Sequence, residues 1–295
     1  MNDRNSNKPH RVIFLASLLK AVEQGDAEAQ CELGRMYASG AGIPKDSKMA
    51  FSLWMGAANQ GNADAQNNLG LMFANGDGVP QDFRKAFEWF QKAAEQGHAW
   101  AQYHLGLMYR NGHGIPLDHQ KAAEWYEKAA EQGHLWAQHD LAALYLNGQD
   151  FSKALKWYLK AAEQGEPDSQ YNIGIMYLKG RGTSQNPQKA MEWYQKAAEQ
   201  GHDGAQHDLG LMYATGLGIP QDFQKAFYWW TASAEQGNVH AQYHLGIMYK
   251  NGYGVPQDNS KASEWALKAA EQGLPEAKKL LQHLMEQNEY KHPRP

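Results

Sequence analysis

Apolar residues recur along the chain at the three-to-four-residue spacing of an amphipathic helix, and short runs of turn residues interrupt them. After Gly97, for example, Leu105 and Met108 share one predicted helical face before a loop that contains glycine and proline. Asp118 is placed to cap a second helix, which ends before Gly133. The pattern predicts two helices joined by a turn.

This two-helix pattern repeats along nearly the whole sequence, and the tetrapeptide Ala-Glu-Gln-Gly, or a close variant, marks each repeat. Its last residue is found at Gly25, Gly61, Gly97, Gly133, Gly165, Gly201, Gly237 and Gly273. Successive glycines are 36 residues apart, except for one step of 32 residues. A fixed period of this size predicts a stacked-repeat architecture.

We therefore expect an all-α fold of about 16 helices in antiparallel pairs, with seven full repeats and a half repeat at each end. A single repeat solenoid is expected over residues 11–287, between a disordered N-terminus at 1–10 and a disordered tail at 288–295. The short repeat after Gly133 lacks residues in its loop, where Gly148-Gln-Asp150 stands, so both of its helices should survive.

Two packing expectations follow from the recurring residues. Gly106 costs about 1 kcal/mol relative to alanine in a helix, which is tolerable if the bare backbone lets the second helix approach. The second helices carry a tryptophan at one equivalent position, and we expect these residues to form the core. They are Trp89, Trp125, Trp157, Trp193, Trp229 and Trp265.

One repeat shows the motif most clearly, with Ala65-Gln66, Leu69-Gly70, Pro80, Lys85-Ala86 and Trp89-Phe90 in order. Over roughly residues 11–287 the pattern resembles the Sel-1-like repeat, a relative of the tetratricopeptide repeat. The resemblance implies a right-handed superhelix and a role as an adaptor, assembly scaffold or signalling regulator. Several bacterial members carry paired cysteines and are exported, whereas this chain has only Cys31.

The resemblance also implies that first helices line a concave groove, into which residues three, six, ten and thirteen places after each glycine point. The six-place row includes Cys31 and Asn67. Aromatic residues dominate interaction hot spots, so we predict that this groove binds a protein or peptide partner. The predicted binding residues are Trp100, Tyr103, Leu107, Arg110, Trp136, His139, Tyr171, Ile175, His207 and Tyr243. For the ten-place row, which holds Leu107 and Ile175, packing between helices is an equal alternative.

Composition excludes several other classes of partner. A net charge of −4 does not suit nucleic acid, and no stretch approaches the roughly 18 apolar residues of a membrane span. The apolar run at 11–19 resembles a signal peptide, but the repeat phase makes it a second helix of a half repeat. With one cysteine and no intramolecular disulfide, we expect a cytoplasmic protein.

Neither catalysis nor a metal is predicted. The sequence has thirteen histidines but no paired His or Cys motif with zinc-site spacing, and no phosphate loop or nucleophile elbow. Polar residues such as Glu131 and Gln132 recur in nearly every repeat, which indicates structure rather than chemistry. No catalytic residue, metal ligand or cofactor is assigned.

The sequence thus predicts a non-enzymatic interaction scaffold. The alternative is a bacterial regulator or immunity-type inhibitor that sequesters a cognate toxin or enzyme, and a metal-dependent hydrolase is the weakest candidate. A homodimer through the terminal helices is also open, because Leu280, Leu281, Leu284 and Met285 could dock a second copy.

Overall fold

The computed structural model describes residues 8–291, and every regular element in that range is an α-helix. The chain forms two compact parts, one ending at Leu144 and the other beginning at Tyr145, which are described separately. The first contains α1 (Lys8–Glu23), α2 (Ala27–Ser39), α3 (Ser47–Asn59), α4 (Ala63–Asn75), α5 (Phe83–Glu95), α6 (Ala99–Asn111), α7 (His119–Glu131) and most of α8 (Leu135–Asn147). The second contains α9 (Phe151–Glu163), α10 (Pro167–Lys179), α11 (Pro187–Glu199), α12 (Asp203–Thr215), α13 (Phe223–Glu235), α14 (Val239–Asn251), α15 (Asn259–Glu271) and α16 (Pro275–Lys291).

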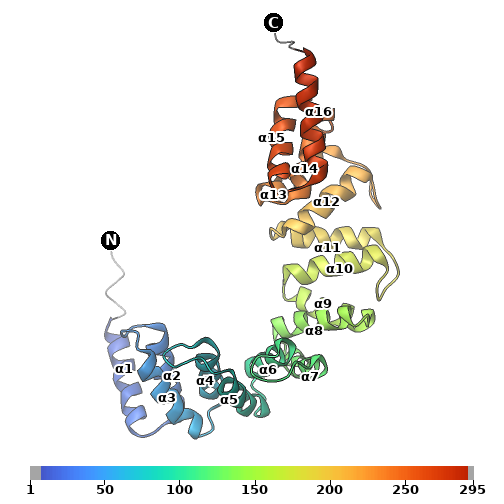
Figure 1. Cartoon of the computed structure of the whole chain (residues 1–295). Coiled ribbons are helices and arrows are strands. Elements are labelled where there is room, and N and C mark those ends of the chain that lie inside the picture. Colours follow the sequence, from blue (N-terminus) through green and yellow to red (C-terminus); the bar gives the residue numbers. More distant parts are fainter. Residues whose placement is uncertain (1–7, 292–295) are drawn as a thin grey trace. The chain divides into compact units, whose positions relative to one another are not determined.

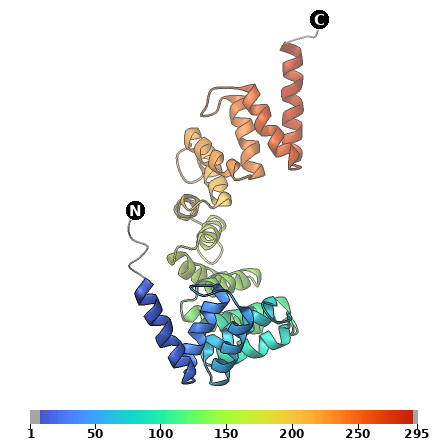
Figure 2. The ribbon, with the colours of Figure 1, turned by 90° about the vertical axis from the view of Figure 1, so that its left-hand side faces the viewer.

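Within each part, a helix packs mainly on the helices before and after it in the sequence (Figures 1 and 2). The two helices of one repeat, such as α4 and α5 or α12 and α13, make the most extensive contacts. This confirms the predicted all-α fold of paired helices in seven repeats. The predicted disordered ends lie largely outside the described residues, although α1 begins at Lys8 and α16 extends to Lys291.

The helix ends follow the predicted capping pattern. His98 accepts a hydrogen bond from the Ala101 backbone N–H through Nδ1, and Asp118 caps α7 by accepting from Lys121 N–H. Gly97 has a φ of +90°, a left-handed conformation that favours glycine, which explains why glycine recurs at this turn.

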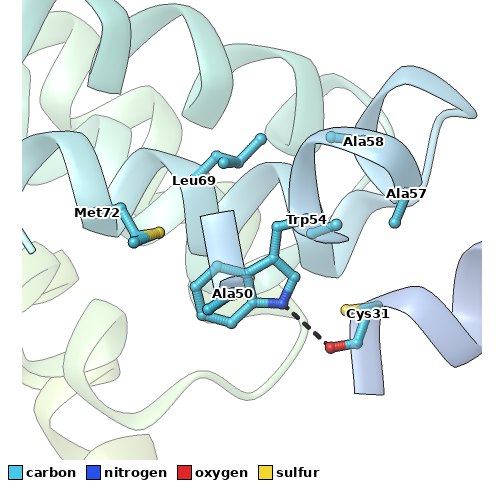
Figure 3. Packing of buried hydrophobic residues seen from close by; sticks show 8 residues of the cluster. Cys31, Ala50, Trp54, Ala57, Ala58, Leu69 and Met72 are labelled. Atoms are coloured by element: carbon cyan, nitrogen blue, oxygen red, sulfur yellow. Dashed lines mark hydrogen bonds between the residues drawn. The ribbon is translucent and has the colours of Figure 1, made fainter. Parts of the chain in front are cut away.

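In all full repeats but the last, the core contains a large ring from the second helix, and the first repeat shows how it is held (Figure 3). The Trp54 indole N–H donates to the Cys31 carbonyl at 3.1 Å, across the two helices. The same ring lies on Gly34, where a β-carbon would come within 2.6 Å of Trp54 Nε1. The recurring glycine therefore makes room for an aromatic side chain of the second helix, and not only for the backbone of that helix.

The prediction that the recurring tryptophans form the core was wrong for most of them, which are only partly buried. In most repeats the buried ring belongs to the residue after the tryptophan: Tyr126 is fully buried, whereas Trp125 is only partly buried. After Trp265 that place holds the buried Ala266. The Lys128 ammonium lies 3.8 Å from the Trp125 ring centroid, one helical turn on, and the same arrangement recurs at Trp89, Trp193 and Trp265. Trp157 is the exception: it is buried, as predicted, with 3% of its surface exposed.

A pair of glutamines joins consecutive repeats. Gln102 is buried, and its amide donates to the Ala94 carbonyl at the preceding helix end. Its side-chain oxygen accepts from Gln132 Nε2 at 2.8 Å. Equivalent amide pairs link Gln66 with Gln96, Gln170 with Gln200, Gln206 with Gln236 and Gln242 with Gln272. The Ala-Glu-Gln-Gly motif thus has a structural role.

The short repeat keeps both helices, α8 and α9, as predicted. Gln149 in its loop has a φ of +63°, and it is the only non-glycine residue with positive φ in the part of the chain that the structure describes. The shortened turn places a side-chain-bearing residue in a left-handed conformation that glycines occupy in the longer loops.

The terminal helix α16 uses most of its apolar face inside the fold. Leu280 and Leu284 are buried in a cluster with Ala262 and Ala266 of α15. Of the residues predicted for a homodimer contact, only Met285 is largely exposed, at 60%. Leu280 and Leu284 complete the core against α15 and are not free to dock a second copy, Leu281 is partly buried, and the homodimer stays a prediction.

Candidate functional site

Two exposed tryptophans of the first helices lie three places after a repeat glycine. Trp100 on α6 is 52% exposed and Trp136 on α8 is 46% exposed, as the prediction of an accessible surface requires. Exposed tryptophans are unusual because each leaves a large apolar area in water.

The Trp100 side chain belongs to a ring cluster on the same surface. Its ring meets the His134 ring edge-on, with centroids 4.4 Å apart, and the Tyr103 ring stacks on the same histidine at 4.7 Å and meets Trp100 edge-on at 6.5 Å. His104, behind them, is tilted against Phe90 at 4.8 Å. These packed neighbours fix the orientation of Trp100, so a partner would meet a pre-organised aromatic face.

Asp140, which the sequence analysis missed, holds two of the predicted residues together. Its carboxylate accepts from the Tyr103 hydroxyl at 3.1 Å and from Arg110 Nη1 at 2.8 Å. Burial, followed by the charge of Asp140, raises the pKa of Tyr103, so the hydroxyl stays protonated and donates. A sequence signal existed: an aspartate follows a histidine, as His139-Asp140 and again as His207-Asp208.

Trp100 also changes the environment of His134, the residue that caps α8. His134 Nδ1 accepts from the Ala137 N–H, so the neutral ring carries its proton on Nε2. In two other repeats the equivalent cap pairs its Nε2 with an aspartate, His98 with Asp64 at 2.9 Å and His202 with Asp168 at 3.1 Å. Trp100 stands where those aspartates stand, and His134 Nε2 is buried without a hydrogen-bond partner.

The C-terminal part contains a related set of contacts. The Tyr171 hydroxyl donates to Asp208 Oδ2 at 3.1 Å, and the Tyr171 ring packs on Tyr194 and on the capping His202. His207 Nδ1 lies 2.9 Å from Asp208 Oδ1. Two predicted residues, Tyr171 and His207, therefore meet on a carboxylate that the prediction omitted.

The remaining predicted residues are less accessible. Leu107, His139, Ile175 and Tyr243 are partly buried, and Ile175 packs against the core around Tyr194, as the packing alternative holds. The prediction that residues six places after each repeat glycine point into the groove was wrong in the first two repeats.

The two residues concerned are Cys31, which is completely buried, and Asn67, which is 7% exposed. Burial raises the pKa of the Cys31 thiol to about 12, so it carries no thiolate at neutral pH.

A second histidine group surrounds Trp230. His244 stacks on the Trp230 ring at 4.3 Å, and His207 and His240 lie nearby. Burial, helped by the two neighbouring histidines, lowers the pKa of His244 to about 4. Within residues 8–291, no group of three His, Cys, Asp or Glu side chains has a geometry that could hold a metal ion. The stacked rings explain these histidines as packing residues.

Comparison with known proteins agrees with this architecture. The Sel1 repeat profile matches residues 27–62, 63–98, 101–134, 137–166, 167–202, 204–238 and 239–274. The chain belongs to the Sel1 repeat family. The family is a tetratricopeptide-like scaffold family, typically non-enzymatic, whose repeats typically bind proteins or peptides.

Two solved structures are similar over most of the chain. A Sel1 repeat protein from Oxalobacter formigenes is 38% identical with a TM-score of 0.73, and the match covers 96% of this chain and 82% of that one. A protective antigen of uropathogenic Escherichia coli is 36% identical with a TM-score of 0.87. That match covers 90% of this chain but 58% of the antigen's, so the chain spans less than two thirds of that relative.

More distant matches say nothing of what this chain binds. An immunity protein from Pseudomonas aeruginosa is 22% identical with a TM-score of 0.40, over 71% of this chain and 81% of that one. No protein of curated function matches the chain significantly. Among the described helices, none combines the length and the apolar character needed to cross a membrane.

Proposed function

We propose that the chain is a non-enzymatic scaffold that binds a partner protein or peptide on the exposed surface of its first helices. The observation that carries the proposal is the position of Trp100 and Trp136. Both are largely exposed and both occupy a repeat position that elsewhere holds a small or polar residue. Tryptophan at a protein surface is the residue most enriched in binding hot spots.

The supporting geometry is the packed base beneath Trp100. Tyr103 and His134 pack against its ring, and Asp140 holds Tyr103 through its hydroxyl, so the ring loses little conformational freedom on binding. Acidic residues at the same position in other repeats pair with the capping side chain instead, Asp64 with His98 and Asp168 with His202. The variable position is therefore used for structure in some repeats and is available for binding at Trp100.

The experiment is affinity capture from a native extract with the full chain and two variants. Trp100→Ala/Trp136→Ala removes both exposed rings, and Tyr228→Ala removes a ring on the second helix α13 that is 64% exposed. We expect a partner that wild type and Tyr228→Ala retain and that the double variant loses. Retention by a correctly folded double variant would contradict the proposal.

The identity of the captured protein separates an adaptor from the regulator or immunity-type inhibitor, since either would use the same surface. Cytoplasmic location is proposed on the single buried cysteine and on the repeat phase of α1, and cell fractionation tests it.

A further inference from the structure

Two groups of four side chains, related by a shift of 68 residues, match at three positions and differ at the fourth. Tyr103 and Asp140 in the N-terminal part correspond to Tyr171 and Asp208 in the C-terminal part, and both tyrosines donate to their aspartate at 3.1 Å. The buried rings Tyr126 and Tyr194 correspond in the same way. The difference lies thirteen places after the repeat glycine.

That position holds Arg110 in the first group and Leu178 in the second. Arg110 Nη1 donates to Asp140 Oδ1 at 2.8 Å, so this carboxylate has a permanent cation beside it. Asp208 has no such neighbour from this position. Its described contacts are the Tyr171 hydroxyl and the His207 ring, neither of which is a permanent cation.

A cavity of about 490 Å³ lies beside Leu178 and reaches Asp208. Its walls come from α10, α11, α12 and the loop after α12. They include Leu178, Tyr194, Asp208, Leu211, Met212 and Leu217. The volume is in the range of ligand pockets, and the wall is mostly apolar and carries one charged group.

The rim of this cavity is open to solvent. Leu211 is 40% exposed and Leu217 is 46% exposed, while the Asp208 side chain retains 26% of its accessible surface. A ligand can therefore reach the carboxylate past two apolar side chains.

We propose that this cavity binds an arginine side chain of the partner. The guanidinium would pair with Asp208, as Arg110 pairs with Asp140, and the methylene stem would lie along Leu178, Leu211 and Met212. The Arg110–Asp140 pair shows that the repeat geometry accommodates a guanidinium at this place. The inference rests on the proposed function and adds the chemistry of one contact.

The test uses a small probe and needs no identified partner. N-acetyl-L-arginine amide is titrated into the full chain with ¹³C-methyl labels on leucine and methionine, and N-acetyl-L-citrulline amide is the uncharged, nearly isosteric control. We expect saturable shifts at Leu178, Leu211 and Met212, with citrulline binding about tenfold more weakly because the charged hydrogen bond is lost.

Two variants complete the test. Asp208→Asn should weaken arginine binding about tenfold. Leu178→Arg should abolish it by supplying an internal guanidinium, and the fold should tolerate this change because Arg110 occupies the equivalent place. Equal binding of citrulline, absence of shifts at these methyl groups, or unchanged binding to Leu178→Arg would overturn the proposal.

The outcome is separable from that of the proposed function. A captured partner that requires Trp100 and Trp136 but binds Asp208→Asn and Leu178→Arg unchanged would leave the scaffold function standing and remove the arginine site. If the probe binds at Asp208 but no captured partner depends on the two tryptophans, the arginine site stands and the proposed scaffold surface is removed.

Discussion

The ring of Tyr126 lies directly against the Cα of Gly106, so that a β-carbon added there would come within 2.3 Å of Tyr126 Cδ1. The relation recurs across the repeats. The other pairs, at 2.5–2.6 Å, are Gly34 with Trp54, Gly70 with Phe90, Gly174 with Tyr194 and Gly210 with Trp230. One glycine and one ring, on different helices, together set how closely the helices of a repeat approach.

Gly106→Ala should therefore destabilise the chain by about 1–3 kcal/mol, because overpacking outweighs the helix propensity of alanine. Urea unfolding followed by circular dichroism measures the change. The matched control is Gly246→Ala, since that repeat has Ala266 in place of the ring and the nearest side-chain atom is 3.1 Å away. Equal losses for the two variants would show that the ring is not responsible.

The glutamine pair should contribute to the contact between repeats. Gln102→Ala leaves the buried Ala94 carbonyl without its donor and removes one of the acceptors of the Gln132 amide, which keeps its bond to the Gly97 carbonyl, at a cost of about 1–3 kcal/mol. Gln132→Ala should cost less, because Gln132 is exposed and water can replace it. The double variant should lose less stability than the sum of the losses in the two single variants. A loss equal to that sum would mean that the two amides do not interact.

Gln149→Gly should stabilise the chain by about 1 kcal/mol. A left-handed backbone is strained for a residue with a β-carbon, and glycine removes that strain. Thermal unfolding compares this variant with Gln185→Gly, a loop residue of the longer repeat without positive φ, which should not stabilise. A lower melting temperature for Gln149→Gly would contradict the expectation.

Stability should fall as the pH is lowered from about 6.5 to 4. Burial lowers the pKa of His104 and of His244 to about 4 in the folded chain, against an ordinary value of 6.5. In this range the unfolded chain binds protons that the folded chain does not, so the free energy of unfolding decreases with decreasing pH. The loss is about 3 kcal/mol for each histidine.

His104→Asn tests this assignment, because Asn68 and Asn172 occupy the equivalent place in other repeats. Urea unfolding at several pH values should show a shallower pH dependence for this variant and for His244→Asn. His119→Asn, at an exposed position, serves as the control and should keep the wild-type dependence. An unchanged slope in the two buried variants would assign the pH dependence to other groups.

The architecture was predictable from the sequence because each repeat confirms the others. The period fixes the helix pairs, and turn residues such as Gly97 and Asp118 mark where helices end and begin. The choice between Trp125 and Tyr126 as the core residue was not predictable from periodicity. Both are large and adjacent, and only the structure shows that Lys128 covers Trp125 while Gly106 receives Tyr126.

The candidate site was only partly predictable. The exposure of Trp100 could be predicted from its place in the repeat. The repeat period fixes where that position lies on the first helix, and only the residue type varies between repeats. Asp140 was missed because the sequence alone does not distinguish a paired aspartate from one that is simply exposed to solvent. Its role depends on Tyr103 and Arg110, which are 37 and 30 residues away in sequence.

Partner binding should depend on the exposed rings of the first helices. Isothermal titration calorimetry of the captured partner against the Trp100→Ala chain measures this dependence. We expect an affinity about 30-fold weaker than that of wild type, as for a hot-spot residue worth about 2 kcal/mol, with Tyr228→Ala within about twofold of wild type. Unchanged affinity for a folded Trp100→Ala chain, or an equal loss for Tyr228→Ala, would contradict it.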